Sequence, residues 1–264
     1  MTQAFDQQFS GRVVLVSGAA QGIGRTLMER LLHAGAHVAA LDIDAKALAL
    51  AAGTLNAGDR LSVHGVDVSD PAAVEHAVAA AETHHGRIDH LACVAGTLQM
   101  GRLLELSDAQ WQNAFRVNTD GVFYLTRAVG KRMMTRREGS VVVVSSNAAS
   151  TPRMSMGAYC ASKAAATQMT RCLGLELAEY GIRCNVVSPG STDTEMLHGM
   201  WQSPADRDTT LEGSLETYKA GIPLKRIAAP DDICEGILYL LSDSARHITL
   251  HDLRLDGGAT LGQI

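Results

Sequence analysis

The stretch "RVVLVSGAAQGIG" (residues 12–24) joins a short apolar run to a glycine-rich turn and to the start of a helical pattern. The run contains three valines and one leucine, a composition typical of a strand that is buried on both faces. Gly18, Gly22 and Gly24 allow a tight turn, close approach of the backbone to a pyrophosphate, and close packing of helix on strand. Free amides at the start of a helix favour phosphate. This stretch therefore predicts a strand–turn–helix unit that can bind a dinucleotide.

The same alternation of strand and helix continues along the chain. Helical patterns separate further β-branched runs, which are "HVAALD" (37–42), "LSVHGVD" (61–67), "RIDHLACVAG" (87–96), "GSVVVVSS" (139–146), "IRCNVVSPG" (182–190) and "LRLDGG" (253–258). Repeated strand–helix–strand units form parallel sheets with helices on both faces. We expect one α/β domain over residues 1–264, a Rossmann-type doubly wound parallel sheet of about seven strands. Residues 1–10 are expected to form a flexible tail.

Local signals mark several helix ends. Asp70 is a candidate N-cap with Pro71 at the first helical position. A long helix is expected to begin near Ser107. The cations in "KRMMTRRE" (131–138) are expected at the solvated end of that helix, where positive charge suits the macrodipole.

Residues 191–223 interrupt this alternation. The segment holds Met196, Met200, Trp201 and Tyr218 among polar residues. Long insertions in compact domains often cover active sites. The alternative is a surface loop with a packed helix, but we interpret the segment as a substrate lid.

Charge and composition argue against several classes of protein. The formal net charge is −5 and the pI is near 6.0, so no basic surface for nucleic acid or an acidic membrane is expected. Five cysteines form no CxxC pair and ten histidines form no ligand motif, which predicts neither disulfides nor a metal site. The polar N-terminus does not resemble a signal peptide, and no apolar stretch is long enough for a membrane span. We expect a cytoplasmic protein.

A second candidate site surrounds "YCASK" (159–163), which places Tyr159 and Lys163 on one helix face. A free tyrosine has a pKa of about 10, and a nearby ammonium lowers it by favouring the phenolate. Ordinary packing is the alternative for this pair. Ser146 precedes Tyr159 by thirteen residues, at the end of a predicted strand, where its hydroxyl could bind a substrate oxygen. Asn118 stands inside a helical pattern although Asn is a poor helix former, which indicates a role such as holding a water.

Asp42 ends the second predicted strand, where a carboxylate can accept hydrogen bonds from the adenosine ribose. It would repel a 2′-phosphate, so NAD is favoured, although Arg25 leaves NADP open. The alternative for Asp42 is a helix cap, a role that Asp44 could fill as well. Asp67, at the end of the third predicted strand, could contact the adenine edge or cap a helix.

Taken in order, these motifs resemble the short-chain dehydrogenase/reductase superfamily from residue 12 almost to the end. The motifs are the glycine-rich turn, Asp67, "CVAG" (93–96), Asn118, Ser146, "YCASK", "NVVSPG" (185–190) and "LDGG" (255–258). The family's usual "NNAG" is "CVAG" here, so only the backbone role of Ala95 and Gly96 carries over. Segments such as "STPRMSMGAYCASKAA" (150–165) and "GIPLKRIAAPDDI" (221–233) are similar to members that oxidise a carboxylated cyclic diol to a catechol for siderophores.

The resemblance implies a division of roles. Tyr159 would take the proton of a ring hydroxyl, Ser146 would hold the oxygen, and Lys163 would lower the tyrosine pKa and contact the nicotinamide ribose. Asn118 would anchor a water that links Lys163 to solvent. The NAD-binding residues would be Gly18, Gln21, Gly22, Ile23, Gly24, Asp42, Ile43, Asp67, Val68, Ala95, Gly96, Tyr159, Lys163, Pro189, Gly190 and Thr192.

The resemblance also bears on substrate and assembly. A carboxylated substrate calls for a cation, and Arg153, between Ser146 and Tyr159, can offer a planar two-pronged donor; a surface arginine is the alternative. The helices near 108–134 and 157–180, together with the apolar C-terminal strand, resemble the surfaces through which the family forms homotetramers. Two rival functions are a dehydrogenase for another cyclic or secondary alcohol and a non-catalytic dinucleotide-binding protein.

Overall fold

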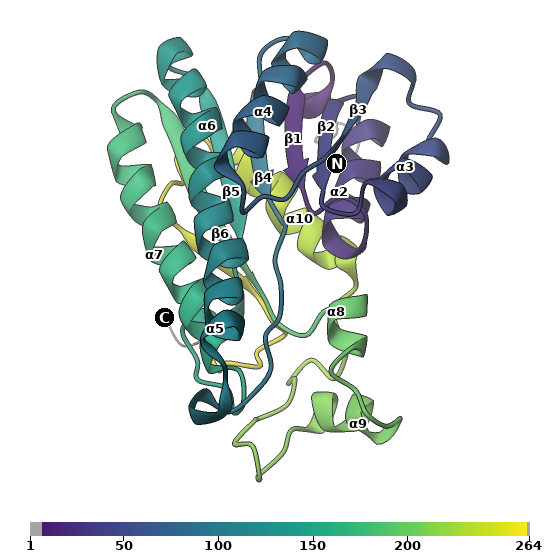
Figure 1. Ribbon diagram of the computed structural model, residues 1–264, viewed down its shortest axis with the longest axis vertical. Coiled ribbons are helices and arrows are strands. Elements are labelled where there is room, and N and C mark those ends of the chain that lie inside the picture. The colour runs from purple at the N-terminus through teal and green to yellow at the C-terminus, as the bar shows by residue number, and fades with distance from the viewer. Residues whose placement is uncertain (1–6, 263–264) are drawn as a thin grey trace.

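A seven-stranded parallel sheet runs through the centre of the molecule (Figure 1). The structure is a computed structural model and describes residues 7–262. The strands are β1 Val13–Ser17, β2 His37–Asp42, β3 Leu61–Gly65, β4 His90–Cys93, β5 Gly139–Val144, β6 Ile182–Pro189 and β7 Asp252–Leu255. They lie in the order β3-β2-β1-β4-β5-β6-β7 with every pair parallel. This arrangement confirms the predicted fold class.

The order of the strands reverses next to β1, which pairs with β2 on one side and with β4 on the other. Ligands of open α/β sheets bind at such a switch point, outside the carboxyl ends of the strands. Ser17 at the end of β1 lies beside Cys93 at the end of β4. The glycine-rich turn and the "CVAG" segment therefore begin side by side.

Helices cover both faces of the sheet (Figure 1). They are α2 Gly22–His33, α3 Ala45–Gly53, α4 Pro71–His85, α5 Asp108–Phe115, α6 Gly121–Arg136, α7 Gly157–Ala178, α8 Glu195–His198, α9 Ala205–Glu212 and α10 Pro230–Leu241. Leu27 of α2, Leu48 of α3 and Ile237 of α10 belong to one buried cluster. Val78 of α4 and Leu125 of α6 belong to the other. None of the helices within residues 7–262 has the length and apolarity needed to cross a membrane.

The chain also makes several short turns of helix. The 3₁₀ turns are η1 Gln7–Phe9, η2 Gly58–Arg60, η3 Leu103–Glu105, η5 Asn147–Ala149 and η6 Asp243–Ala245, and η4 Arg116–Asp120 is a turn of π-helix.

The helix starts follow their capping residues. Asp70 accepts hydrogen bonds from the amides of Ala72 and Ala73, and Pro71 is the first residue of α4, as predicted. The helix predicted to begin near Ser107 does begin there, and Ser107 closes a capping box with Gln110 at the start of α5. The long helix expected from Ser107 is interrupted, because η4 separates α5 from α6.

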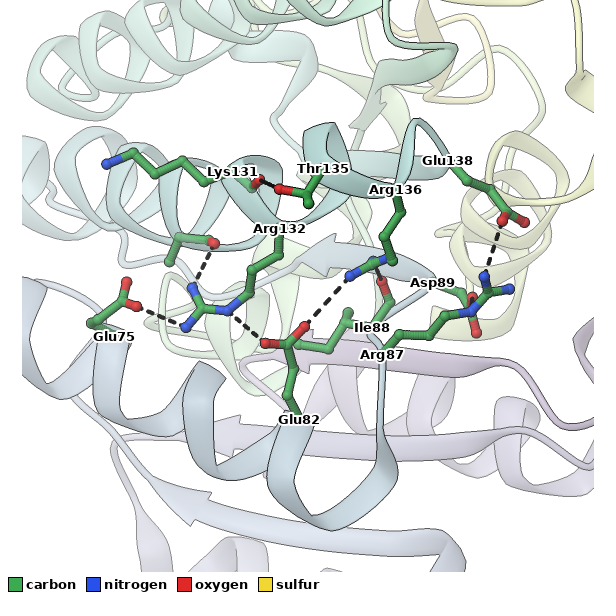
Figure 2. Close-up of polar contacts among 11 residues, drawn as sticks. Glu75, Glu82, Arg87, Ile88, Asp89, Lys131, Arg132, Thr135, Arg136 and Glu138 are labelled. Atoms are coloured by element: carbon green, nitrogen blue, oxygen red, sulfur yellow. Dashed lines mark hydrogen bonds and ion pairs between the residues drawn. The ribbon is translucent and has the colours of Figure 1, made fainter.

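The basic run 131–138 does not lie wholly on a solvated face (Figure 2). Arg132 of α6 pairs with Glu75 and Glu82 of α4 at 2.8 and 2.7 Å, and Arg136 also reaches Glu82. Both arginines are only partly exposed. The prediction was wrong for these two cations, because α4 packs alongside α6 and supplies carboxylates that are distant in the sequence.

Two predicted segments differ from the layered body. Of the tail expected at residues 1–10, residues 1–6 lie outside the described part, whereas Gln7–Phe9 form η1 and Phe9 is buried. Residues 191–223 carry α8 and α9, which lie apart from the helical layers at the bottom of Figure 1. An isolated antiparallel bridge joins Ser214 to Lys219 in the same segment.

Candidate active site

The glycine-rich turn leaves no room for side chains. A Cβ on Gly18 would lie 2.8 Å from the backbone of Ala95, and one on Gly24 would lie 2.0 Å from the carbonyl oxygen of Gly18. Gly18 and Gly22 also have positive φ angles of 71° and 52°. The backbone therefore requires glycine at these positions, and the turn can approach a ligand closely.

The first turn of α2 is open to an anion. Its N-cap is Gln21, in an extended conformation, and the Gln21 side chain caps no amide. Ile23 follows inside the helix, and Thr194 packs over Gly22, since a Cβ there would lie 3.2 Å from its methyl group. Uncapped amides and the positive end of the helix dipole together suit a phosphate.

Asp42 ends β2 beside this turn. Its Oδ2 accepts a hydrogen bond from the Ala20 amide and its Oδ1 accepts one from the Asp44 amide, both at 2.9 Å. Asp44 caps α3 with its own carboxylate, so Asp42 does not fill the alternative capping role. Ile43, which follows Asp42, is 72% exposed. Each carboxylate oxygen of Asp42 keeps a lone pair for a further donor such as a ribose hydroxyl.

Asp67 and Val68 border the same edge of the sheet. Asp67 does not end a strand as predicted, because β3 stops at Gly65. Hydrogen bonds from the Ser69 hydroxyl and amide hold its carboxylate and keep its pKa below the usual range. It does not cap α4, whose N-cap is Asp70. Val68 is buried under α6, where a Cβ on Gly121 would clash with it.

The end of β4 is fixed by side chains from two other elements. The Ser17 hydroxyl accepts hydrogen bonds from the amides of Val94 and Ala95 at 3.1 and 3.2 Å. A Cβ on Gly96 would lie 3.1 Å from Lys163 Nζ and 3.2 Å from Asn118 Oδ1. Gly96 is therefore the point where the first candidate site meets the second.

Asn118 is fully buried inside the π-helical turn η4. Its Oδ1 accepts a hydrogen bond from the Thr97 amide at 2.8 Å, and its Nδ2 donates to Thr97 O and to the Ser162 hydroxyl. The side chain thus ties the loop after β4 to α7. Turns of π-helix are often found at functional sites, because the extra residue reorients part of the helix.

Ser146, Tyr159 and Lys163 come together at the carboxyl ends of β5 and β6. All three are buried, with 9%, 8% and 4% of their surfaces exposed. Lys163 Nζ donates to the carbonyl of Val144 at 2.9 Å and lies 5.9 Å from the centre of the Tyr159 ring. The predicted grouping of a phenol, an ammonium and a hydroxyl is present, with the ammonium directed at the strand.

Burial dominates the electrostatics of this group. It raises the pKa of the Tyr159 phenol, while hydrogen bonding to Ser146 acts in the opposite direction. Burial also lowers the pKa of Lys163 to about 8. The sequence led us to expect a lowered tyrosine pKa, but in this structure desolvation outweighs the nearby polar groups. Ionising the phenol therefore needs additional positive charge next to the ring.

The segment after β6 forms the remaining wall. Pro189 ends β6, and a Cβ on Gly190 would lie 2.7 Å from the side chain of Asp256. Thr192 is buried and pairs with Ala228 through an isolated parallel bridge. These contacts place the end of β6 against the loop that follows β7, and the start of the segment 191–223 against the stretch before α10.

Arg153 lies in the turn between η5 and α7. Its carbonyl accepts a hydrogen bond from the Met156 amide, and its side chain is half-buried. Burial lowers the pKa of the guanidinium, while the carboxylate of Asp256 and the sulfur of Cys160, when ionised, act in the opposite direction. Arg153 is therefore close to Cys160, the neighbour of Tyr159 on α7.

Several supporting residues were not identified from the sequence. Ser17 and Ser162 hold the loop after β4, and the Ser145 hydroxyl bonds Thr167 Oγ1 at 2.6 Å and the Lys163 carbonyl. Each is a small polar residue next to a motif, at the end of β1, inside "YCASK" or just before Ser146. Only their positions beside these motifs could have identified them as supporting residues, since serine is too common to be informative by itself.

Comparisons with known proteins agree with this geometry. A family described as enoyl-(acyl carrier protein) reductase matches residues 18–260. The chain is 49% identical to the 2,3-dihydro-2,3-dihydroxybenzoate dehydrogenase of Bacillus subtilis, over 96% of this chain and 97% of that protein. It is 44% identical to the vibriobactin-specific 2,3-dihydro-2,3-dihydroxybenzoate dehydrogenase of Vibrio cholerae, over 97% and 98%.

A solved structure supports the same assignment. A 7α-hydroxysteroid dehydrogenase complexed with NADH and 7-oxo glycochenodeoxycholic acid superposes with a TM-score of 0.89, at 25% identity and over 97% of each chain. The glycine-rich turn at the switch point suits a nicotinamide dinucleotide, and the phenol, ammonium and hydroxyl beside it suit an alcohol or ketone. Together with these relatives, they show that the chain belongs to the short-chain dehydrogenase/reductase superfamily and is an oxidoreductase.

Proposed function

We propose that this protein oxidises 2,3-dihydro-2,3-dihydroxybenzoate to 2,3-dihydroxybenzoate with NAD⁺, a reaction that supplies the catechol of catecholate siderophores. The observation that carries the proposal is the 49% and 44% identity to two enzymes of that name over almost the whole chain. The buried group of Ser146, Tyr159 and Lys163 supports it, because a protein that only bound dinucleotides would not need this group.

In this proposal the chain's own residues manage the proton. Ser146 donates a hydrogen bond to the oxygen of one ring hydroxyl, and the Tyr159 phenolate removes the proton from that hydroxyl. When bound, NAD⁺ accepts the hydride from the carbon that carries the hydroxyl. The resulting ketone loses a ring proton and gains one on oxygen, which gives the aromatic catechol. Aromatisation draws the oxidation forward.

Lys163 and Asn118 are proposed to help the Tyr159 phenol lose its proton. Lys163, held by the Val144 carbonyl, would contact the nicotinamide ribose and add positive charge near the ring. Asn118 hydrogen-bonds three atoms, the amide and carbonyl of Thr97 and the Ser162 hydroxyl, and so holds the loop that carries Gly96 against α7, which carries Lys163. We propose that the π-turn around Asn118 also orders a water that passes the proton from Lys163 to solvent.

We propose NAD rather than NADP as the cofactor, because Asp42 ends β2. Its carboxylate oxygens each have one amide donor and can accept from the two ribose hydroxyls. A 2′-phosphate would place a second negative charge against this carboxylate. Gln21, Ile23, Ile43, Asp67, Val68, Pro189, Gly190 and Thr192 are proposed to line the rest of the dinucleotide.

Substrate capture and assembly are further parts of the proposal. Residues 191–223 would close over the substrate, and Arg153 would bind its carboxylate.

Trp111 of α5, Phe123 of α6 and Leu175 of α7 are 40%, 41% and 70% exposed, a surface on which a homotetramer could form. We place the enzyme in the cytoplasm. Sedimentation of a monomer at micromolar concentration would contradict the tetramer.

Steady-state formation of NADH from the dihydrodiol tests the reaction. We expect kcat/KM for the dihydrodiol to exceed that for other cyclic and secondary alcohols, which are the substrates of the alternative dehydrogenase. Similar turnover across a panel of such alcohols would favour that alternative. Binding of NAD without turnover of any of these compounds would favour a non-catalytic role.

A further inference from the structure

The first turn of α7, which carries Tyr159, has no capping side chain. The N-caps of α3, α4 and α5 accept hydrogen bonds from helix amides through a carboxylate or a hydroxyl. The N-cap of α7 is Met156, whose side chain caps no amide. A helix start without a capping residue depends on other segments for its position. Tyr159 is the third residue of α7, so its phenol moves with this turn.

The segment after β4 supplies contacts to this turn. Gly101 pairs with Met156 through an isolated parallel bridge, and its amide donates a hydrogen bond to the Ser155 carbonyl at 2.9 Å. Ser155 has a φ of 57°, in the left-handed region that residues with a Cβ rarely adopt. Such angles persist where surrounding contacts hold them. The bond from Gly101 is one of these contacts.

Leu103 adds a side-chain contact to the same turn. A Cβ on Gly157, the first residue of α7, would lie 2.5–2.7 Å from Cγ and both methyl groups of Leu103. Leu103 is nevertheless 57% exposed, and its neighbour Leu104 is fully exposed. The covered part of Leu103 therefore rests on Gly157, where the absence of a side chain makes room for it.

The segment 97–106 is itself fixed at both ends. Asn118 binds the amide and the carbonyl of Thr97, and Ser107 closes the capping box of α5. Between them, Gly101 has a φ of 142°, and a Cβ there would lie 2.6 Å from a methyl group of Leu106. The backbone at Gly101 therefore requires glycine. A segment held in this way can fix the start of α7.

The next turn of α7 is attached to the same part of the chain. The Thr119 hydroxyl donates to the carbonyl of Ser162 at 3.0 Å, and Asn118 Nδ2 donates to the Ser162 hydroxyl at the same distance. Residues 97–119 therefore contact α7 on both sides of Tyr159 along the helix.

We propose that Gly101 and Leu103 are positioning residues, which hold the first turn of α7 so that the Tyr159 phenol meets the substrate hydroxyl at the correct distance. Neither residue touches the reacting atoms, because both act through α7. Misplacing a reacting group by about 1 Å can slow a reaction by about 10²-fold. This inference rests on the proposed function, in which Tyr159 is the base.

Gly157→Ala separates position from stability. The new methyl group would push the half-exposed Leu103 into water, whereas alanine favours a helix over glycine, so Tm should not fall. We expect kcat for the dihydrodiol to fall about tenfold and KM for NAD to change less than about twofold, because the turn after β1 is untouched. Leu103→Ala should lower kcat by a similar factor. Leu104→Ala is the matched control and should change neither kcat nor Tm.

A double variant tests whether the two residues act through one contact. In Leu103→Ala/Gly157→Ala the methyl group at 157 fills part of the space that the leucine leaves, so most of the lost kcat should return. Losses that multiply in the double variant would overturn the inference. So would single variants with the kcat of the wild type.

These ratios should be measured with the dihydrodiol and with whichever alcohol the wild type oxidises fastest. If that alcohol is not the dihydrodiol, the proposed substrate fails, and equal losses on the better alcohol still support the role of Leu103.

Amide hydrogen exchange decides the inference without any substrate. The amides of Gly101 and Cys160 bind the carbonyls of Ser155 and Met156. Both amides should exchange faster in Leu103→Ala than in the wild type, and at the wild-type rate in Leu104→Ala. Unchanged exchange in Leu103→Ala would overturn the inference, even for a protein that oxidised no alcohol.

Discussion

The turn after β1 and the segment 191–223 border the same site but are built in different ways. In the turn, backbone contacts backbone, and Gly24 has another carbonyl 2.0 Å from where its Cβ would be. The segment has only short helices, a hairpin and exposed apolar side chains such as Leu215 and Tyr218. The difference fits the proposed function, in which the main chain binds the dinucleotide and side chains from distant segments bind the substrate.

Tyr159→Phe should have the largest effect, because it should lower kcat strongly and leave the affinity for NAD almost unchanged. Removing the phenol oxygen takes away the proposed base and leaves the turn after β1 unchanged. We expect kcat to fall about 10²–10⁴-fold, as for loss of a general base, with little change in NAD affinity. The wild type should become more active as pH rises and the phenol ionises, and the variant should lose this dependence. A variant that keeps most of its kcat would show that Tyr159 is not the base.

Gly24→Ala tests whether the turn depends on its main chain. The new methyl group would overlap the Gly18 carbonyl, so we expect a loss of about 1–3 kcal/mol in stability and weaker NAD binding. Gly53→Ala at the end of α3 is the control, because nothing lies within 4 Å of its Cβ position, and it should be neutral or stabilising. Thermal melts and NAD titrations of both variants check this. Identical melting temperatures and NAD affinities would show that the turn can expand.

His90, in β4 of the sheet that supports both regions, should make the stability of the fold depend on pH. Burial lowers its pKa to about 4 from the usual 6.5, and it packs against the Phe9 ring. As pH falls below 6.5 the unfolded chain gains a proton that folded His90 does not, so stability is lost progressively down to about pH 4. From pH 7.5 to 5 this amounts to about 2 kcal/mol.

Replacing His90 should therefore reduce the acid sensitivity of the fold. We expect the difference in Tm between pH 7.5 and 5 to shrink by several degrees in His90→Gln. His76→Gln, at an exposed position of α4, should leave that difference unchanged. An unchanged difference in His90→Gln would mean that other groups govern unfolding in acid.

Asp42→Ala makes a smaller change and tests the one side chain on which cofactor choice is proposed to depend. Without the carboxylate, we expect the preference for NAD over NADP in kcat/KM to narrow about tenfold, the worth of a charged hydrogen bond. Asp44→Ala removes a neighbouring carboxylate that caps α3, so it should lower stability and leave the preference intact. Equal use of both cofactors by the wild type would contradict the role of Asp42.

The sequence was most informative where a local pattern has a local cause. The strand His37–Asp42 was predicted with its observed bounds, because a buried parallel strand needs a continuous apolar run. The cap at Asp70 followed from its own side chain. Glycines of the first turn could be recognised because their spacing reflects backbone geometry. Such features need no knowledge of the rest of the fold.

Features that depend on distant contacts were not predictable. The π-turn at Arg116–Asp120 was not predicted, and the only indication of an irregularity was Asn118, a poor helix former inside a helical pattern. The pairing of Arg132 with Glu82 requires that α4 lie beside α6. The packing of α4 on α6, rather than the local sequence, brings Arg132 and Glu82 together.

The bonds from the Ser17 hydroxyl to the amides of Val94 and Ala95 also constrain how the protein matures. A chain emerging from the ribosome completes the glycine-rich turn early, but the opposite wall arrives only after two further strands and their helices have been synthesised. Lys163, whose Nζ lies next to Gly96, is synthesised later still. Pro189, Gly190 and Thr192 come last, so the proposed nucleotide site is complete only after six of the seven strands have been synthesised.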